Sequence, residues 1–317
     1  MFVGIFLAGS FLMIWRLEAM NKSGVEGTVL GTLVMPYCSG MGNLIFAFIM
    51  ARKAGLGDKV LENALVNNVT NMTVLLGLPA IFWTMNVLPA SKASKGKKKK
   101  SDQKEYKINR LSLLLTLTAA IFFTGAVWAL GADGKINSGD GFVLIGLFLF
   151  WQCFHIFEVL KSNVRQNKSF TWQLPFDLLL LGVGRYAIYF STEWLVNWIS
   201  GIHSGFISAK YLGWLSGWLM VLPNGLLALY YARRGNPEVV YTSQVGDGHI
   251  SIPLCLGIFS MYQTIDLPRF FYTGAKILLF AAVIHFVFVA LLGRLPRLMG
   301  WVLTGTYLIF LYVGLGK

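Results

Sequence analysis

The sequence predicts an all-α polytopic membrane protein of about ten transmembrane helices, arranged as two inverted five-helix repeats. Three observations support this: an apolar composition, apolar segments of helical length, and an internal repeat. Hydrophobic residues make up 56% of the chain and charged residues 13%, and the mean hydropathy is +0.62. Only helices and closed barrels satisfy their backbone hydrogen bonds in lipid, and apolar runs of about 20 residues predict helices.

Gly, Pro and charged residues divide the apolar sequence into ten expected helices. They span residues 1–15, 27–50, 62–86, 111–131, 141–161, 174–199, 211–232, 239–261, 271–293 and 297–316. We divide the chain into a first half (1–91, helices 1–3), a basic loop (92–110), helices 4–5 (111–165) and a second half (166–317, helices 6–10). No cleavable signal is expected, because Met1 leads directly into the first apolar segment.

The net charge of +13 is concentrated beside the membrane spans rather than spread over a nucleic-acid-binding surface. Nine Lys and Arg residues lie between Lys92 and Arg110. By the positive-inside rule this loop is cytoplasmic, and both termini lie on the opposite side. The run Lys97–Lys100 would also attract anionic lipid headgroups, but a solvated topology signal is the favoured interpretation.

The sequence has no pattern typical of an enzyme or a resident metal. Cys38, Cys153 and Cys255 lie in apolar stretches without CxxC or Cys/His spacing, so neither a disulfide framework nor a zinc site is expected. No P-loop or nucleophile elbow is present. We therefore expect a protein that is not an enzyme and that has no cofactor.

A twelve-residue segment of the second helix returns in the seventh. Residues Gly42–Lys53 and Pro223–Arg234 share an Asn, two Ala and a basic pair in register. In the ten-helix topology these two helices start on opposite sides of the membrane. The pattern therefore predicts an inverted repeat, an architecture typical of secondary transporters.

Two polar stripes follow this repeat in the third and eighth helices. Positions i, i+4 and i+8 share one face of a helix, so each stripe can line a common cavity. The stripes consist of Asn63, Asn67 and Asn71, and of Ser243, Asp247 and Ser251, and are widened by Asn68 and Gln244. For any single residue, hydrogen bonding between helices is the alternative. Recurrence at matched offsets in both halves favours a functional site.

Asn43 and Asn224 lie about 20 residues before these stripes, beside helix-breaking residues. These are Gly40, Gly42, Pro223 and Gly225. A broken helix at mid-depth would free backbone carbonyls and amides for ion binding, so we expect an interruption in both helices.

Asp247 is the strongest single candidate, because an ionisable group at the centre of a span costs roughly 2.5–3.5 kcal/mol. We expect it to carry the ion or proton; a neutral Asp that bonds to a neighbouring helix is the alternative. His249 is a possible proton relay, as are His155 and His285, although such histidines also simply join helices. Spacing leaves open whether Asp177, Glu158 and Arg185 form a buried pair or lie at interfaces.

Four short elements resemble those of the cation/calcium exchanger superfamily. In that family each α-repeat has a Gly-Thr-Ser-x-Pro-Glu-type element followed by a Gly-Asn-x-x-Gly-Ser-Asn-type element. The corresponding segments here are Cys38–Asn43 and Glu62–Asn68, and then Leu219–Asn224 and Thr242–Gly248. The resemblance places the family's repeat glutamates at Asn43 and Asn224, both amides, and places Asp247 at the motif serine.

The resemblance implies a secondary active cation antiporter of the sodium/calcium exchanger type, working by alternating access on Na⁺, K⁺, H⁺ or Ca²⁺. Calcium sites normally use several carboxylates, so a single Asp favours a monovalent cation or a proton over calcium. A non-transporting membrane scaffold derived from an exchanger is the alternative. The expected ion-binding residues are Asp247, Asn43, Asn224, Asn67, Asn71, Asn63, Ser243, Ser251, Asn68 and Gln244.

Overall fold

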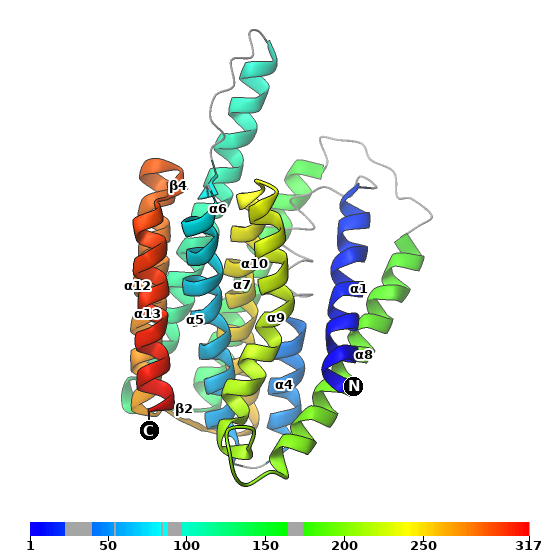
Figure 1. The fold of residues 1–317 in the computed structure, drawn as a ribbon, viewed down its shortest axis with the longest axis vertical. Coiled ribbons are helices and arrows are strands. Elements are labelled where there is room, and N and C mark those ends of the chain that lie inside the picture. The colour runs from blue at the N-terminus through cyan, green and yellow to red at the C-terminus, as the bar shows by residue number, and fades with distance from the viewer. Residues whose placement is uncertain (23–39, 54, 84, 88–96, 164–173, 317) are drawn as a thin grey trace.

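The computed structural model describes residues 1–22, 40–53, 55–83, 85–87, 97–163 and 174–316, and Figure 1 shows them as a bundle of roughly parallel and antiparallel helices. The first half contains α1 (Phe2–Lys22), α4 (Met41–Ala51), α5 (Gly57–Phe82), α6 (Lys97–Leu130) and α7 (Ser138–Asn163). The second half contains α8 (Leu174–Ser200), α9 (Leu212–Arg233), α10 (Pro237–Ile250), a π-helical turn (Ser251–Cys255), α11 (Leu256–Tyr262), α12 (Arg269–Leu292) and α13 (Arg297–Leu315). Short 3₁₀ turns lie at Gly131–Asp133 and Ala209–Tyr211.

These elements confirm the predicted all-α polytopic membrane protein. The segment α10, π turn and α11 together form the expected eighth helix, and α4 forms the second half of the expected helix 27–50. Within the described ranges, five helices are long and apolar enough to cross a membrane. They are α5, the Arg110–Asp133 part of α6 and its 3₁₀ turn, α9 with its preceding turn, α12 and α13.

Two short β-ribbons join the halves reciprocally. Strand β1 (Met85–Asn86), which follows α5, pairs antiparallel with β4 (Arg294–Leu295), which lies between α12 and α13. Strand β3 (Ile265–Asp266), which follows α11, pairs in the same way with β2 (Lys135–Ile136), which lies between α6 and α7. The ribbons lie at opposite ends of the bundle (Figure 1). Exchanging the two halves therefore converts one ribbon into the other, as an inverted repeat requires.

Close contacts between glycines show the same reciprocal pairing of the two halves. Gly77 of α5 packs on Gly300 of α13, and a Cβ at Gly300 would lie 2.7 Å from the Gly77 carbonyl oxygen. Gly257 of α11 packs on Gly141 of α7, where a Cβ at Gly141 would lie 2.8 Å from the Gly257 carbonyl oxygen. Each half thus brings its third helix close to the last helix of the other half. The structure confirms the predicted inverted five-helix repeats.

The helices α1 and α8 form an antiparallel pair at one side of the bundle (Figure 1). Arg16 Nη1 lies 3.1 Å from Asp177 Oδ1, and these side chains are only 12% and 6% exposed. Asp177 is therefore part of a buried ion pair with Arg16, whereas Arg185 is exposed. The side chain of Glu158 lies outside the described residues.

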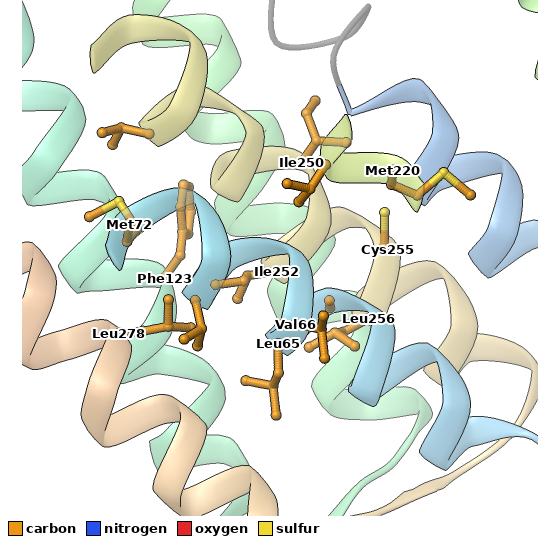
Figure 2. Packing of buried hydrophobic residues seen from close by; sticks show 14 of the residues in the cluster. Leu65, Val66, Met72, Phe123, Met220, Ile250, Ile252, Cys255, Leu256 and Leu278 are labelled. Carbon is orange, nitrogen blue, oxygen red and sulfur yellow. The ribbon is translucent and has the colours of Figure 1, made fainter. Parts of the chain in front are cut away.

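The core is built around α5 and the eighth helical segment. In α5, 83% of the apolar stretch is buried, compared with 17% in α13, so α5 is central and α13 peripheral. Figure 2 shows apolar side chains of α5, such as Leu65 and Met72, packed with those of neighbouring helices, such as Phe123 and Leu278. Burial of this apolar surface holds the polar stripe of α5 in a fixed position.

Candidate ion-binding site

The centre of the site is a carboxylate that accepts hydrogen bonds from two amides. Asn67 Nδ2 donates to Asp247 Oδ2 over 2.5 Å, and Asn71 Nδ2 donates to the same oxygen over 2.9 Å. All three side chains are fully buried. Because Asn67 and Asn71 come from α5 and Asp247 from α10, the predicted polar stripes of the two repeats face each other. Charge-assisted bonds of this kind are stronger than bonds between neutral groups.

Several amide oxygens around this centre are buried without a hydrogen-bond partner among the described residues. They are Oδ1 of Asn67, Oδ1 of Asn71 and Oε1 of Gln244. A buried acceptor left unpaired costs about 1–3 kcal/mol, so such groups in a native structure require an explanation. Carbonyl oxygens of this type are suitable ligands for a hard cation.

Asn43 on α4 and Asn224 on α9 are two further predicted amides, and both are buried. Each side chain is 1% exposed, and the described residues provide neither its nitrogen nor its oxygen with a hydrogen-bond partner. Gln244 Nε2 donates to the backbone oxygen of Asn224 over 3.3 Å and to Ser243 Oγ over 2.8 Å, which ties α10 to α9. Gly42, beside Asn43, allows α4 and α9 to approach, since a Cβ there would collide with Met220.

The structure tests the predicted helix interruption in the second half, whereas the interruption before Asn43 stays a prediction. α4 begins at Met41, directly after Gly40, so Asn43 lies in its first turn; residues 27–39 of the expected helix, including Cys38, lie outside the described residues. The expectation for Pro223 and Asn224 was wrong, because α9 continues through both. Proline removes a single N–H donor, and membrane helices tolerate that loss where neighbouring helices support the backbone.

The second half is instead irregular in the eighth helical segment. A π turn at Ser251–Cys255 contains Pro253 and begins four residues after Asp247. Such turns occur frequently at functional sites. This turn was not predicted, although Pro253 within an apolar run was the available signal.

Four other predicted residues make hydrogen bonds between helices or within their own helix. Asn63 Nδ2 donates to Ser216 Oγ of α9 over 3.0 Å, and Ser243 Oγ donates to the Val240 oxygen over 3.1 Å. Asn68 Nδ2 donates to Ser251 Oγ over 2.6 Å, and this hydroxyl in turn donates to the Asp247 backbone oxygen over 3.0 Å. The bonds of Asn63 and Asn68 match the helix-joining alternative, whereas the Ser243 bond lies within α10.

Ser216 was not among the predicted residues. Its position offered a signal, because it lies eight residues before Asn224 and therefore on the same stripe of α9.

The buried histidines contact neighbouring helices. His249 Nε2 lies 2.9 Å from the Thr116 oxygen of α6, and its ring packs against Phe123 and Trp151 with centroid distances of 5.7 and 5.8 Å. His285 Nε2 lies 2.8 Å from the Met72 oxygen of α5. A relay role for His249 stays a prediction, and the His155 side chain lies outside the described residues.

Comparisons with known proteins agree with this architecture. The family model described as sodium/calcium exchanger protein matches residues 1–157 and 176–316. The chain is 29% identical over 90 residues to sodium/potassium/calcium exchanger 2 of Gallus gallus, and 30% identical over 77 residues to that of Homo sapiens. These segments cover 27% and 24% of this chain but only 14% and 12% of the relatives, which are much longer.

Solved structures of the sodium-calcium exchanger NCX_Mj have the same fold. One, soaked with Na⁺ and Sr²⁺, has a TM-score of 0.66 at 19% identity, covering 99% of this chain and 96% of that one. Another, soaked with Na⁺ and Ca²⁺, has a TM-score of 0.63 with the same identity and coverage. Because the family model matches nearly the whole length, the chain belongs to the sodium/calcium exchanger protein family.

Proposed function

We propose that this protein is a secondary active cation antiporter that works by alternating access, with Asp247 binding the transported ion. The observation that carries the proposal is the buried carboxylate between two amides, at the contact between α5 of one repeat and α10 of the other. Sites formed between inverted repeats near mid-depth are typical of secondary transporters.

The neutral ligands in this proposal are amide oxygens. Rotation of the Asn67 and Asn71 side chains would turn Oδ1 towards an ion held by Asp247. Gln244 Oε1, Asn43 Oδ1 and Asn224 Oδ1 are further buried acceptors that the described residues leave without a partner. Asn63, Asn68 and Ser251 would then support the ligands through hydrogen bonds between helices, and Ser243 would do so through bonds within α10.

We propose a monovalent cation or a proton as the preferred substrate. Among the described side chains, Asp177 and Asp247 are the buried acids, and Asp177 is paired with Arg16. Calcium takes six to eight oxygen ligands, several of them normally carboxylates. One carboxylate with neutral amides compensates one positive charge.

The direct test compares two Asp→Asn substitutions in reconstituted liposomes. Asp247→Asn keeps the shape of the side chain but removes its charge, so cation-driven flux should fall to the level of protein-free vesicles. Asp266→Asn makes the same chemical change at a side chain that is 85% exposed, and should retain flux. Unchanged flux in the Asp247→Asn protein would reject the assigned role.

A non-transporting scaffold is the second candidate, favoured by the amides at both positions where the resemblance places the family's glutamates. Ligand that binds only the folded state raises the apparent melting temperature with concentration. An exchanger should therefore be stabilised by at least one of Na⁺, K⁺, Ca²⁺ or H⁺. Absence of any response would favour the scaffold.

A further inference from the structure

We infer that His285 is a positioning residue for the proposed ion site, because its ring joins the helix that carries Asn71 to the helix that carries Asp247. The inference rests on the proposed antiport function and names a group that tunes ion binding without touching the ion. His285 lies on α12, outside the two helices whose polar stripes meet at the carboxylate. It acts through the backbone of α5.

Both nitrogens of the His285 ring have a partner on one of these two helices. Nε2 lies 2.8 Å from the backbone oxygen of Met72 in α5, and Nδ1 lies 3.3 Å from the hydroxyl of Tyr241 in α10. The His285 and Tyr241 side chains are fully buried. A backbone oxygen only accepts, so a neutral ring has its proton on Nε2, and Nδ1 accepts from the Tyr241 hydroxyl. The hydrogen bonds therefore run in one direction, from α10 through His285 to α5.

This chain and the carboxylate form two separate connections between the same pair of helices. Met72 directly follows Asn71, whose Nδ2 donates to Asp247 Oδ2 over 2.9 Å. Tyr241 precedes Asp247 by six residues, which is about 9 Å along α10. A single contact would let α5 rotate about it, whereas two separated contacts fix the rotation of α5 relative to α10. That rotation sets the position of the Asn71 amide at the carboxylate.

A second chain of hydrogen bonds holds the other flank of Asn71. Trp218 Nε1 of α9 donates to the Tyr307 hydroxyl of α13 over 2.8 Å, and this hydroxyl lies 3.1 Å from Thr70 Oγ1. Thr70 and Met72 lie on either side of Asn71 around the helix, at about 100° each. The turn of α5 that carries Asn71 is therefore anchored to α13 on one side and to α12 on the other.

A positioning role differs from simple helix joining in what its loss changes. A histidine that only joins helices contributes to stability and leaves ion affinity unchanged. Groups that orient the ligands of a metal ion typically change its affinity by about 10-fold or more when they are removed. Ion affinity is therefore the measurement that separates the two roles.

The test removes one hydroxyl from the chain. Tyr241→Phe keeps the buried ring and deletes the donor to His285 Nδ1. The matched control is Tyr272→Phe, because the Tyr272 hydroxyl also bonds to another helical element, donating to the Gly131 oxygen after α6 over 3.1 Å. Both proteins are titrated in a thermal-shift assay with Na⁺, K⁺, Ca²⁺ and protons. For each ion that stabilises the wild type, the midpoint should rise about 10-fold in Tyr241→Phe and less than about 2-fold in the control.

Flux in liposomes and a double-mutant cycle complete the test. In Tyr241→Phe the KM for the ion should rise with the midpoint, while the flux at saturating ion stays within about 2-fold of wild type. In an Asn71→Ala protein, Tyr241→Phe should shift the midpoint by less than about 2-fold, since the amide that it positions is absent.

The outcomes distinguish the inference from the function on which it rests. Equal midpoints in Tyr241→Phe and Tyr272→Phe, or the same shift with and without Asn71→Ala, would overturn the positioning role and leave the antiport proposal intact. A wild-type protein that no tested ion stabilises, and that exchanges none of these ions, would reject the antiport proposal itself.

Discussion

Two consecutive residues of α5, Asn67 and Asn68, have different roles at the site. Asp247 Oδ2 accepts hydrogen bonds from Asn67 and Asn71 of this helix. Asn67 donates to this carboxylate, whereas Asn68 donates to Ser251 Oγ and to the Ala64 oxygen of its own helix. Consecutive helical residues are separated by about 100°, so the two side chains necessarily point in different directions. One amide contacts the charge, and the other positions the helix that carries it.

This difference predicts distinct consequences for two alanine variants. Asn67→Ala removes a donor from Asp247 and should weaken ion-dependent thermal stabilisation, whereas Asn68→Ala should lower the ion-free melting temperature and leave the ion-dependent increment near wild type. Each lost bond should cost about 1–3 kcal/mol. Titrating both variants with Na⁺ and K⁺ in a thermal-shift assay checks this. Equal ion responses in the two proteins would contradict the assignment.

A second carboxylate should change the ion preference. Asn224 is 1% exposed and has unpartnered side-chain atoms among the described residues, so Asn224→Asp adds a charge near Gln244 with almost no change in size. We expect the variant to lose stability without ions and to gain stabilisation by Ca²⁺ that the wild type lacks. Exposed Asn236 provides the control Asn236→Asp. If Ca²⁺ stabilised the variant no more than the wild type, the number of carboxylates would not explain a preference for monovalent cations.

The sequence predicted that Asn67, Asn71 and Asp247 face a common cavity, because helical periodicity decides which residues share a face. It grouped Asn68 and Ser251 with them as ion ligands, although these two bond to each other. Periodicity gives a direction around the helix axis, but the partner met in that direction depends on the packing of a helix distant in sequence. Ser216 was missed for this reason.

At the scale of elements, the halves are held together by close helix crossings at glycine. Gly77 and Gly300 bring the backbones of α5 and α13 into contact, and Gly257 and Gly141 do the same for α11 and α7. Small residues allow such close approach in membranes, where apolar burial alone does not favour helix association.

Adding a methyl group at one crossing should therefore destabilise the fold. Gly300→Ala places Cβ 2.7 Å from a backbone oxygen, and we expect a loss of about 1–3 kcal/mol and a lower melting temperature. Gly305→Ala, in the same helix, meets no atom within 4 Å and should be neutral or slightly stabilising. Thermal unfolding in one detergent compares them directly. Similar melting temperatures would show that the crossing can relax.

At the scale of the molecule, the internal repeat and the expected ten-helix topology together predicted the inverted architecture. Equivalent residues of the two halves are also separated by the same number of positions. Asn67 and Asp247 lie 180 positions apart in the sequence, as do Gly77 and Gly257. The π turn, the uninterrupted α9 and the ribbons were not predicted. Two-residue strands have no pattern of their own, and whether proline interrupts a helix depends on the helices around it.

The architecture also predicts which ends share a side of the membrane. In Figure 1 the N and C ends lie at the end of the bundle opposite to the start of α6. We expect terminal tags to be digested together from the outer face, and a protease site inserted at residues 92–96 to be cut only from the cytoplasmic face. Protection assays on right-side-out and inverted vesicles measure this. Protection of only one tag would contradict the topology.

The reciprocal ribbons have a consequence for biosynthesis. β1 is translated long before its partner β4, because the whole of the segment from α6 to α12 lies between the two strands. The nascent first half therefore enters the bilayer before β1 has its partner strand. This ribbon between the halves forms only after the segment between α12 and α13 has been synthesised.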